Sequence, residues 1–124
     1  MRHNAAKIHL TIAMLLGLAG VGLLAAGAHS GVAESVTTAG QMLLFHAPVV
    51  IAATAARKVG LLHQIMARIA LSFLCLGVVV FAADLARRGF GGQRLFQDAA
   101  PTGGFLMMAS WFGLALSALF APRT

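Results

Sequence analysis

Four long apolar stretches occupy most of this 124-residue chain, and they restrict its fold more than any other feature. They run roughly over residues 8–28, 42–56, 65–83 and 104–121. A helix needs about 20 apolar residues to cross the hydrocarbon of a bilayer, so the shorter second stretch must extend toward residue 40. Charged residues make up only 10% of the chain, against about a quarter in a soluble domain. We therefore expect the chain to fold in a membrane.

The spanning elements are predicted to be helices. In lipid every backbone N–H and C=O must be paired within the spanning structure, which leaves helices and closed barrels. No segment alternates apolar and polar residues as barrel strands do, and the content of Ala, Leu and Gly suits packed helices. The sequence predicts an all-α fold, an integral membrane four-helix bundle forming one domain over residues 1–124. The expected helices cover about residues 8–28, 40–56, 63–83 and 103–121.

The beginning of the first stretch has some features of a secretory signal. It has basic residues at Arg2 and Lys7, and residues 26–28 read Ala-Gly-Ala, which fits a cleavage site. The apolar run from Ile8 is about 20 residues, however, and a signal core has about 7–15. We expect a retained first helix.

Basic residues are unevenly divided between the two sides that four spans define. The side with both termini and the middle turn carries Arg2, Lys7, Arg57, Lys58, Arg68 and Arg123, and the other side carries Arg87, Arg88 and Arg94. The positive-inside rule then predicts that both termini are cytoplasmic. The net charge of +6 is explained by these helix ends facing lipid headgroups, so we expect membrane lipids as partners and no nucleic acid.

Small residues indicate where the helices pack. In the first helix Gly17, Gly20 and Gly27 fall on one narrow arc, and Gly113 lies on a similar stripe of the fourth helix. Small residues let helix backbones approach closely, either within the bundle, which we favour, or in a dimer. The single cysteine, Cys75, excludes a disulfide within one chain and is interpreted as a small packing residue.

Polar residues gather toward one end of the predicted spans. His29 closes the first helix, Gln41 opens the second with His46 further in, and Asp84 ends the third. Thr102, the expected N-cap of the fourth helix, falls at the same end. Polar groups at membrane depth are costly, so we interpret His29, Gln41, His46 and Asp84 as one polar cluster near the outer leaflet, either ligand-binding or structural.

His46 is the deepest of these residues, and several roles remain open for it. The simplest is a structural hydrogen bond to a neighbouring helix, near the helix disruption expected at Pro48. With Met42 one turn away it forms a copper-type pair, and with His29 it offers two axial haem ligands. Short, glycine-rich helices leave little volume for a macrocycle, so we predict no bound metal and no cofactor.

Four motifs resemble a known family. They are GLLAAGAHS, TAGQMLLFHA, FAADLARRGFGGQRLF and AAPTGGFLMMASW, in that order. Together they resemble the small four-span membrane family called domain of unknown function 423, whose relatives include transmembrane protein 256. The resemblance covers the chain from about Gly17 to Leu119, although Ala83 stands where the family has glycine. It implies a protein of the bacterial inner (plasma) membrane whose biochemical role is not established.

The function predicted from these observations is not enzymatic. No nucleophile–base–acid set, phosphate-binding loop or H-E-x-x-H motif occurs in the sequence. We expect an accessory or scaffold subunit of a larger membrane complex, or a small homo-oligomer. The alternative is a binding protein for a hydrophobic ligand or cofactor, such as a quinone, lipid or haem, at the polar cluster. An ion or proton conduit is a third class, disfavoured because no acidic residue lies in the middle of a span.

Overall fold

The structure, a computed structural model, describes residues 2–122, with side chains described from residue 4. It has four helices: α1 (Arg2–Gly27), α2 (Glu34–Lys58), α3 (Gln64–Gly89) and α4 (Ala99–Leu119). Each is long and apolar enough to cross a membrane, and no strand occurs in residues 2–122. The prediction of an all-α, multi-pass membrane fold is confirmed.

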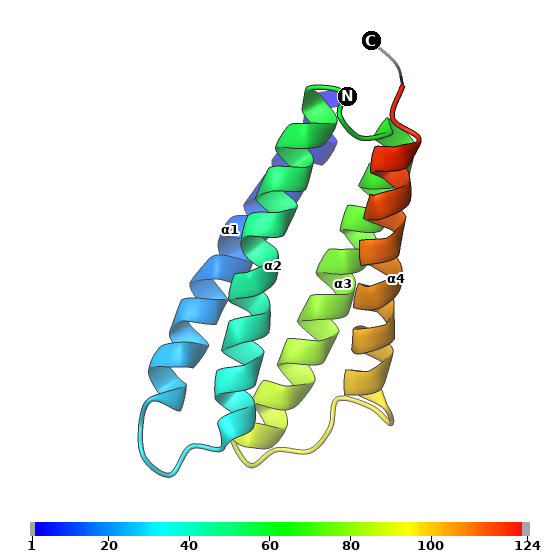
Figure 1. Cartoon of the computed structure of the whole chain (residues 1–124). Coiled ribbons are helices and arrows are strands. Elements are labelled where there is room, and N and C mark those ends of the chain that lie inside the picture. The colour runs from blue at the N-terminus through cyan, green and yellow to red at the C-terminus, as the bar shows by residue number, and fades with distance from the viewer. Residues whose placement is uncertain (1, 123–124) are drawn as a thin grey trace.

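The helices alternate in direction, so the chain has two distinct ends (Figure 1). The start of α1, the turn at residues 59–63 and the end of α4 lie together, and we call this the termini end. The loops at residues 28–33 and 90–98 lie at the opposite end, which we call the loop end. Every polar or charged side chain near a helix terminus therefore belongs to one of two separate groups.

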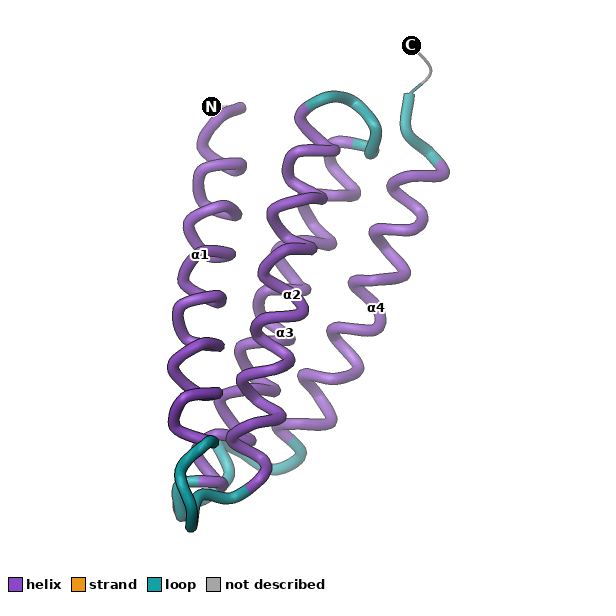
Figure 2. The backbone as a smooth tube through the Cα atoms, turned by 60° about the vertical axis from the view of Figure 1, so that its left-hand side comes forward, coloured by secondary structure: helices purple, strands orange, loops and turns teal. Residues whose placement is uncertain are grey.

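The bundle consists of two helical hairpins joined through their inner helices. α1 packs along α2, α3 packs along α4, and α2 packs on α3, whereas α1 touches α3 only over a short stretch. Contacts of α4 with α1 or α2 are sparser still. Figure 2 shows α2 and α3 in the centre with α1 and α4 on opposite sides. The outer faces of α1 and α4 are thus left for lipid.

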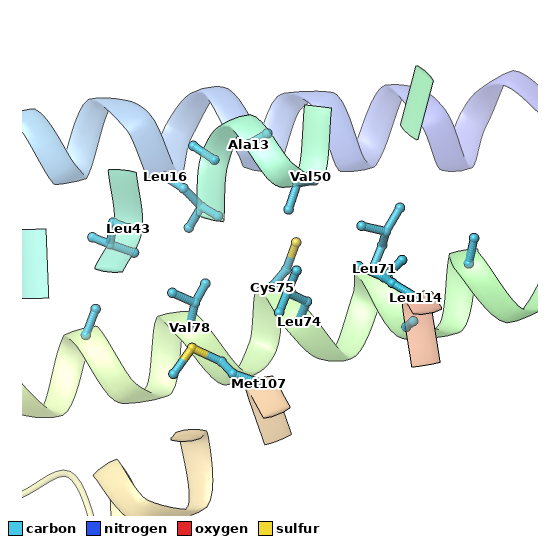
Figure 3. Packing of buried hydrophobic residues seen from close by; sticks show 14 of the residues in the cluster. Ala13, Leu16, Leu43, Val50, Leu71, Leu74, Cys75, Val78, Met107 and Leu114 are labelled. Carbon is cyan, nitrogen blue, oxygen red and sulfur yellow. The ribbon is translucent and has the colours of Figure 1, made fainter. Parts of the chain in front are cut away.

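The apolar core lies along the central helices (Figure 3). α3 contributes Leu71, Leu74 and Val78, all fully buried, and Val50 of α2 packs in the same cluster. Cys75 is 5% exposed and belongs to this core, as expected of a small packing residue. Outside the core, large apolar side chains such as Leu18 and Phe112 face outward, as a bilayer requires.

In each hairpin, a pair of glycines, one from each helix, lies where the two helix backbones approach closely. A methyl group at Gly20 would lie 2.7 Å from Cγ of Leu44 and 3.0 Å from the carbonyl oxygen of Gly40, and one at Gly40 would lie 3.0 Å from the carbonyl oxygen of Gly20. In the second hairpin, a methyl group at Gly103 would lie 2.7 Å from the carbonyl oxygen of Gly77. Both hairpins therefore depend on close approach of two backbones, which a side chain would prevent.

The other glycines expected to pack differ in their surroundings. A methyl group at Gly27 would meet the side chain of Thr37 and its backbone nitrogen, and one at Gly113 would lie 3.2 Å from Cβ of Ala70. At Gly17 the nearest atom is Cβ of Ala47 at 3.9 Å, an ordinary van der Waals separation. The close contact on α1 is therefore made at Gly20 and Gly27.

The helices extend further into the polar segments than the apolar pattern indicates. α2 begins at Glu34 instead of near residue 40, and α3 continues to Gly89 instead of residue 83. Val36 is fully buried, and Gly89 lies directly beside it, so tertiary packing keeps these polar ends helical. A carboxylate at Glu34 also suits the positive end of the helix dipole.

The prediction that Thr102 caps α4 is wrong. The N-cap is Asp98, which adopts a left-handed backbone conformation with φ of 60°, and α4 begins at Ala99. Pro101 fits in the first turn because its missing N–H has no partner to lose there. The backbone N–H of Thr102 donates to the carbonyl oxygen of Asp98, so Thr102 lies inside the helix.

Candidate functional site

Asp84 connects α3 to the long loop at the loop end. Its side chain is 1% exposed, and its Oδ1 accepts a hydrogen bond of 2.9 Å from the backbone N–H of Leu95. Its Oδ2 lies 3.1 Å from Nη2 of Arg88, one turn further along the same helix. The carboxylate therefore anchors the 90–98 loop to α3. It also forms an ion pair with Arg88, whose side chain is 37% exposed.

A cavity of about 550 Å³ opens beside this ion pair, between α3, the loop and the start of α4. Its charged lining comes from Asp84, Arg88, Arg94 and Asp98. Its main apolar lining comes from Phe81, Phe105 and Met108. The volume is within the range of about 300–1,000 Å³ usual for small-molecule sites. The combination of charges and apolar side chains suits a molecule with a polar head and an apolar body.

The local sequence explains why this cavity forms. Gly91 has a φ of 90°, which only glycine adopts readily, and it turns the chain away from α3. Gly103 holds the start of α4 against the backbone of α3. Its neighbour Gly104 lines the cavity, and a methyl group there would meet only Cδ2 of Phe81, at 4.0 Å. The two adjacent glycines thus have separate effects, one on packing and one on the space beside Phe81.

His46 lies near the middle of α2 and joins α2 to α4. Its Nδ1 lies 2.7 Å from the carbonyl oxygen of Met42, and Nε1 of Trp111 donates to its Nε2 across 3.1 Å. A carbonyl can only accept and an indole N–H can only donate, so the ring is neutral and carries its proton on Nδ1. The two rings meet edge to face with centroids 5.8 Å apart. The structural role considered for His46 is the one this geometry supports.

The four residues of the predicted polar cluster occupy different environments. His46 and Asp84 are buried, whereas His29 and Gln41 are exposed. Among the described residues, no hydrogen bond or ion pair joins any two of the four. Val36 of α2 lies beside Gly89 of α3, and this contact is a common reference point for depth in the two helices. With a helical rise of about 1.5 Å per residue, His46 lies about 15 Å from that point along α2, and Asp84 lies about 8 Å from it along α3. The two buried members therefore have separate bonding partners at different depths.

Neither metal nor haem coordination is supported by these contacts. Both ring nitrogens of His46 already have hydrogen-bond partners. Neither nitrogen is therefore free to bind copper together with Met42 or haem iron together with His29. Within the described residues, no group of three or more His, Cys, Asp or Glu side chains is placed to hold a metal ion.

Most residues of this region were not predicted from the sequence to belong to a site, and three of them are informative. Arg94 and Asp98 line the cavity, and Trp111 is the partner of His46. A lone tryptophan in an otherwise apolar span is a usable signal, because its N–H needs an acceptor when it is removed from water. Arg94 gave no such signal, since a basic residue in a loop is normally solvated.

Fold and site together define a small four-span membrane protein with an amphipathic cavity at one end. The chain belongs to the family described as protein of unknown function (DUF423), whose model matches residues 23–104. The match runs from the end of α1 to the first turn of α4 and includes both loops of the loop end. It confirms the resemblance seen in the four motifs. A search of curated proteins and a search of solved structures found no match.

Proposed function

We propose that this protein is a non-enzymatic membrane protein that binds an amphipathic molecule in the loop-end cavity. The observation that carries the proposal is the lining of that cavity, with two Asp and two Arg side chains beside Phe81, Phe105 and Met108. A lipid or a quinone has the matching division into a polar head and an apolar body. Haem is the least suited of the candidate ligands, because the nitrogens of His46 are already bonded.

The polar head would bind beside Arg94. Asp84 already pairs with Arg88, so that guanidinium is largely neutralised. Arg94 is exposed and has no ion-pair or hydrogen-bond partner among residues 2–122, which leaves its donors available to a ligand. Guanidinium groups bind phosphate and carboxylate oxygens through two parallel hydrogen bonds. A carbonyl or phosphoryl oxygen of the ligand is therefore the expected contact.

The apolar part would lie on the side of the cavity that faces the bilayer. Phe105 is 69% exposed and Met108 is 60% exposed, so both are available to a lipid chain or an isoprenoid tail. A ligand could reach the site laterally from the membrane without opening the bundle. The protein would act by holding or presenting the molecule, with no bond made or broken.

We propose the bacterial inner membrane as its location, with both termini in the cytoplasm. The support is the distribution of Lys and Arg: six of the nine lie on the side of the termini. In this orientation the loop end and its cavity face the outer leaflet. The ligand would then be drawn from, or delivered to, the side of the membrane away from the cytoplasm.

The second candidate is a subunit of a larger membrane complex or of a homo-oligomer. The observation that favours it is the outer face of α1, where Ala19, Gly22 and Ala25 are exposed and a methyl group at Gly22 would meet nothing within 4 Å. Small residues on an outward face allow another helix to approach closely.

One experiment tests both candidates. Native mass spectrometry of the purified protein, with membrane lipids retained, reports bound molecules and subunit count in the same spectrum. Gly104→Leu places an isobutyl group beside Phe81 and should remove a ligand from the cavity without changing the subunit count. Gly22→Leu, the same substitution on the outer face of α1, should keep the ligand and dissociate an oligomer. A ligand that persists in Gly104→Leu contradicts the binding proposal.

A further inference from the structure

A second polar site lies at the termini end, where the sequence suggested only charges that set orientation. A cavity of about 430 Å³ is lined by Arg57 and Lys58 from the end of α2 and by Gln64 and Arg68 from the start of α3. Three of these four side chains are cationic. The site lies at the level of the helix ends, where the lipid headgroups begin.

Arg57 is the unusual member of this group. Its side chain is 2% exposed, and only its Nη1 has a side-chain partner, Oε1 of Gln64 at 3.1 Å. Its Nε and Nη2 are buried without a hydrogen-bond partner among the described residues. A guanidinium stays charged in proteins, and a buried charge with unpaired donors is strongly disfavoured unless an anion or acceptor reaches it.

The chain has no acidic side chain of its own to serve as that anion. Its three acidic residues are Glu34, Asp84 and Asp98, and all belong to the loop end. Arg57 and Arg68 meanwhile interact electrostatically with each other, and because their charges are alike they repel. An anion located between them would remove the repulsion and give the guanidinium its missing acceptors.

The surroundings keep this site in shape. The backbone N–H of His63 donates to the carbonyl oxygen of Ser117 at 2.7 Å, which fixes the 59–63 turn to α4. The Gln64 amide donates to the carbonyl oxygen of Arg57, which ties α3 to α2. The N-terminus of α3 adds the positive end of its dipole to the same region. Gln64 and Lys58 are exposed, so the cavity can be reached from the headgroup layer.

We propose that the termini-end cavity binds a phosphate-type anion through Arg57 and Arg68. A tetrahedral group with several oxygens matches two guanidinium groups and an ammonium better than a single carboxylate does. The group can belong to the headgroup of an anionic phospholipid or to free phosphate. This site is independent of the loop-end cavity, and each can exist without the other.

The test measures binding of two defined probes to the full-length protein in detergent. The lipid probes are phosphatidylglycerol and phosphatidylcholine with identical acyl chains, titrated by native mass spectrometry. The proposal predicts preferential binding of phosphatidylglycerol. Arg57→Gln and Arg68→Gln should each weaken that binding about tenfold, the usual size of a lost charge-assisted hydrogen bond. Arg87→Gln makes the same charge change on an exposed side chain at the loop end and should leave binding unchanged.

The second probe separates the two sources of the anion. If millimolar inorganic phosphate displaces phosphatidylglycerol from the wild-type protein, free phosphate is a ligand of the site. If phosphate has no effect while the lipid preference depends on Arg57, the ligand is the headgroup. Equal binding of both lipids, or equal losses in Arg57→Gln and Arg87→Gln, would overturn the proposal. Should Arg57→Gln fail to fold, Arg68→Gln decides, because Arg68 is only half-buried.

Discussion

The indole N–H of Trp111 donates to Nε2 of His46 across 3.1 Å, and this bond joins helices α2 and α4, which otherwise touch little. It lies in the middle of both helices, away from water on the scale of a bilayer. The Nδ1 proton that makes Nε2 an acceptor is held by the carbonyl oxygen of Met42. The hydrogen bond to Met42, one turn away on α2, therefore sets the tautomer of His46. That tautomer leaves Nε2 free to accept the hydrogen bond from Trp111 of α4.

Removing either side of this bond should loosen the two hairpins from each other. Trp111→Phe keeps an aromatic ring but removes the indole N–H that donates to Nε2 of His46, and we expect a loss of about 1 kcal/mol in unfolding free energy. His46→Ala should cost at least as much, because a buried side chain is also removed. The double variant should lose less than the sum of the two single losses. Strictly additive losses in thermal unfolding would mean that the bond contributes nothing.

Adjacent glycines at the start of α4 should differ in their response to the same substitution. Gly103→Ala puts a methyl group 2.7 Å from the carbonyl oxygen of Gly77 and should cost about 1–3 kcal/mol. Gly104→Ala, one position along, meets its nearest atom at 4.0 Å and should be nearly neutral. Thermal unfolding in one detergent compares them. Similar melting temperatures for both variants would argue against close packing of α3 on α4.

The same comparison can be made in the first hairpin. Gly20→Leu should separate α1 from α2 and cost about 1–3 kcal/mol, because the space there is taken by Leu44 and Gly40. Gly22→Leu adds the same side chain on the outer face, where nothing lies within 4 Å of a methyl group. Unchanged stability in Gly20→Leu, measured against Gly22→Leu, would show that the hairpin tolerates a wider spacing.

Asp84 should control the mobility of the 90–98 loop. In Asp84→Ala the amide of Leu95 loses a charge-assisted acceptor, and its hydrogen exchange should become about tenfold faster. Glu34→Ala is the control, since it removes an exposed carboxylate at the same end of the bundle that makes no hydrogen bond or ion pair among the described residues. The prediction fails if exchange at Leu95 is the same in both variants.

Orientation in the membrane can be measured with introduced cysteines. The native Cys75 is buried, so it should give little background labelling. Asn4→Cys at the termini end should be protected from an impermeant thiol reagent in intact cells, and Ser30→Cys in the first loop should be labelled. The reverse pattern would place the loop end in the cytoplasm and turn the amphipathic cavity toward the inner leaflet.

The apolar stretches predicted the spans because the bilayer imposes a length and a composition that are visible in the sequence. The ends of the helices were less predictable, since α2 before residue 40 and α3 after residue 83 are kept helical by burial of Val36 and Asp84. The sequence allows a hydrogen bond from His46 to another helix. It does not identify Trp111 as the partner, because that pairing depends on how α2 and α4 face each other.

The termini-end site illustrates the same limit. Arg57, Lys58 and Arg68 stood in the sequence as basic residues near helix ends, which is the usual signal of membrane orientation. Nothing in their spacing shows that Arg57 is buried with two unpaired nitrogens. The burial of Arg57 arises only when α3 packs back on α2. Gln64 then accepts a hydrogen bond from Nη1 of Arg57 and from neither of its other two side-chain nitrogens.

The central claim, that the loop-end cavity holds an amphipathic molecule, is tested most directly by photocrosslinking. A phospholipid or quinone with a photoreactive group in its apolar part is bound to the protein in bilayers, irradiated, and the attachment sites are mapped. The account predicts attachment at Phe105 and Met108 well above that at Met14, a similarly exposed residue on α1, and its loss in Gly104→Leu. Equal attachment at Met14 and Met108, unaffected by Gly104→Leu, would contradict it.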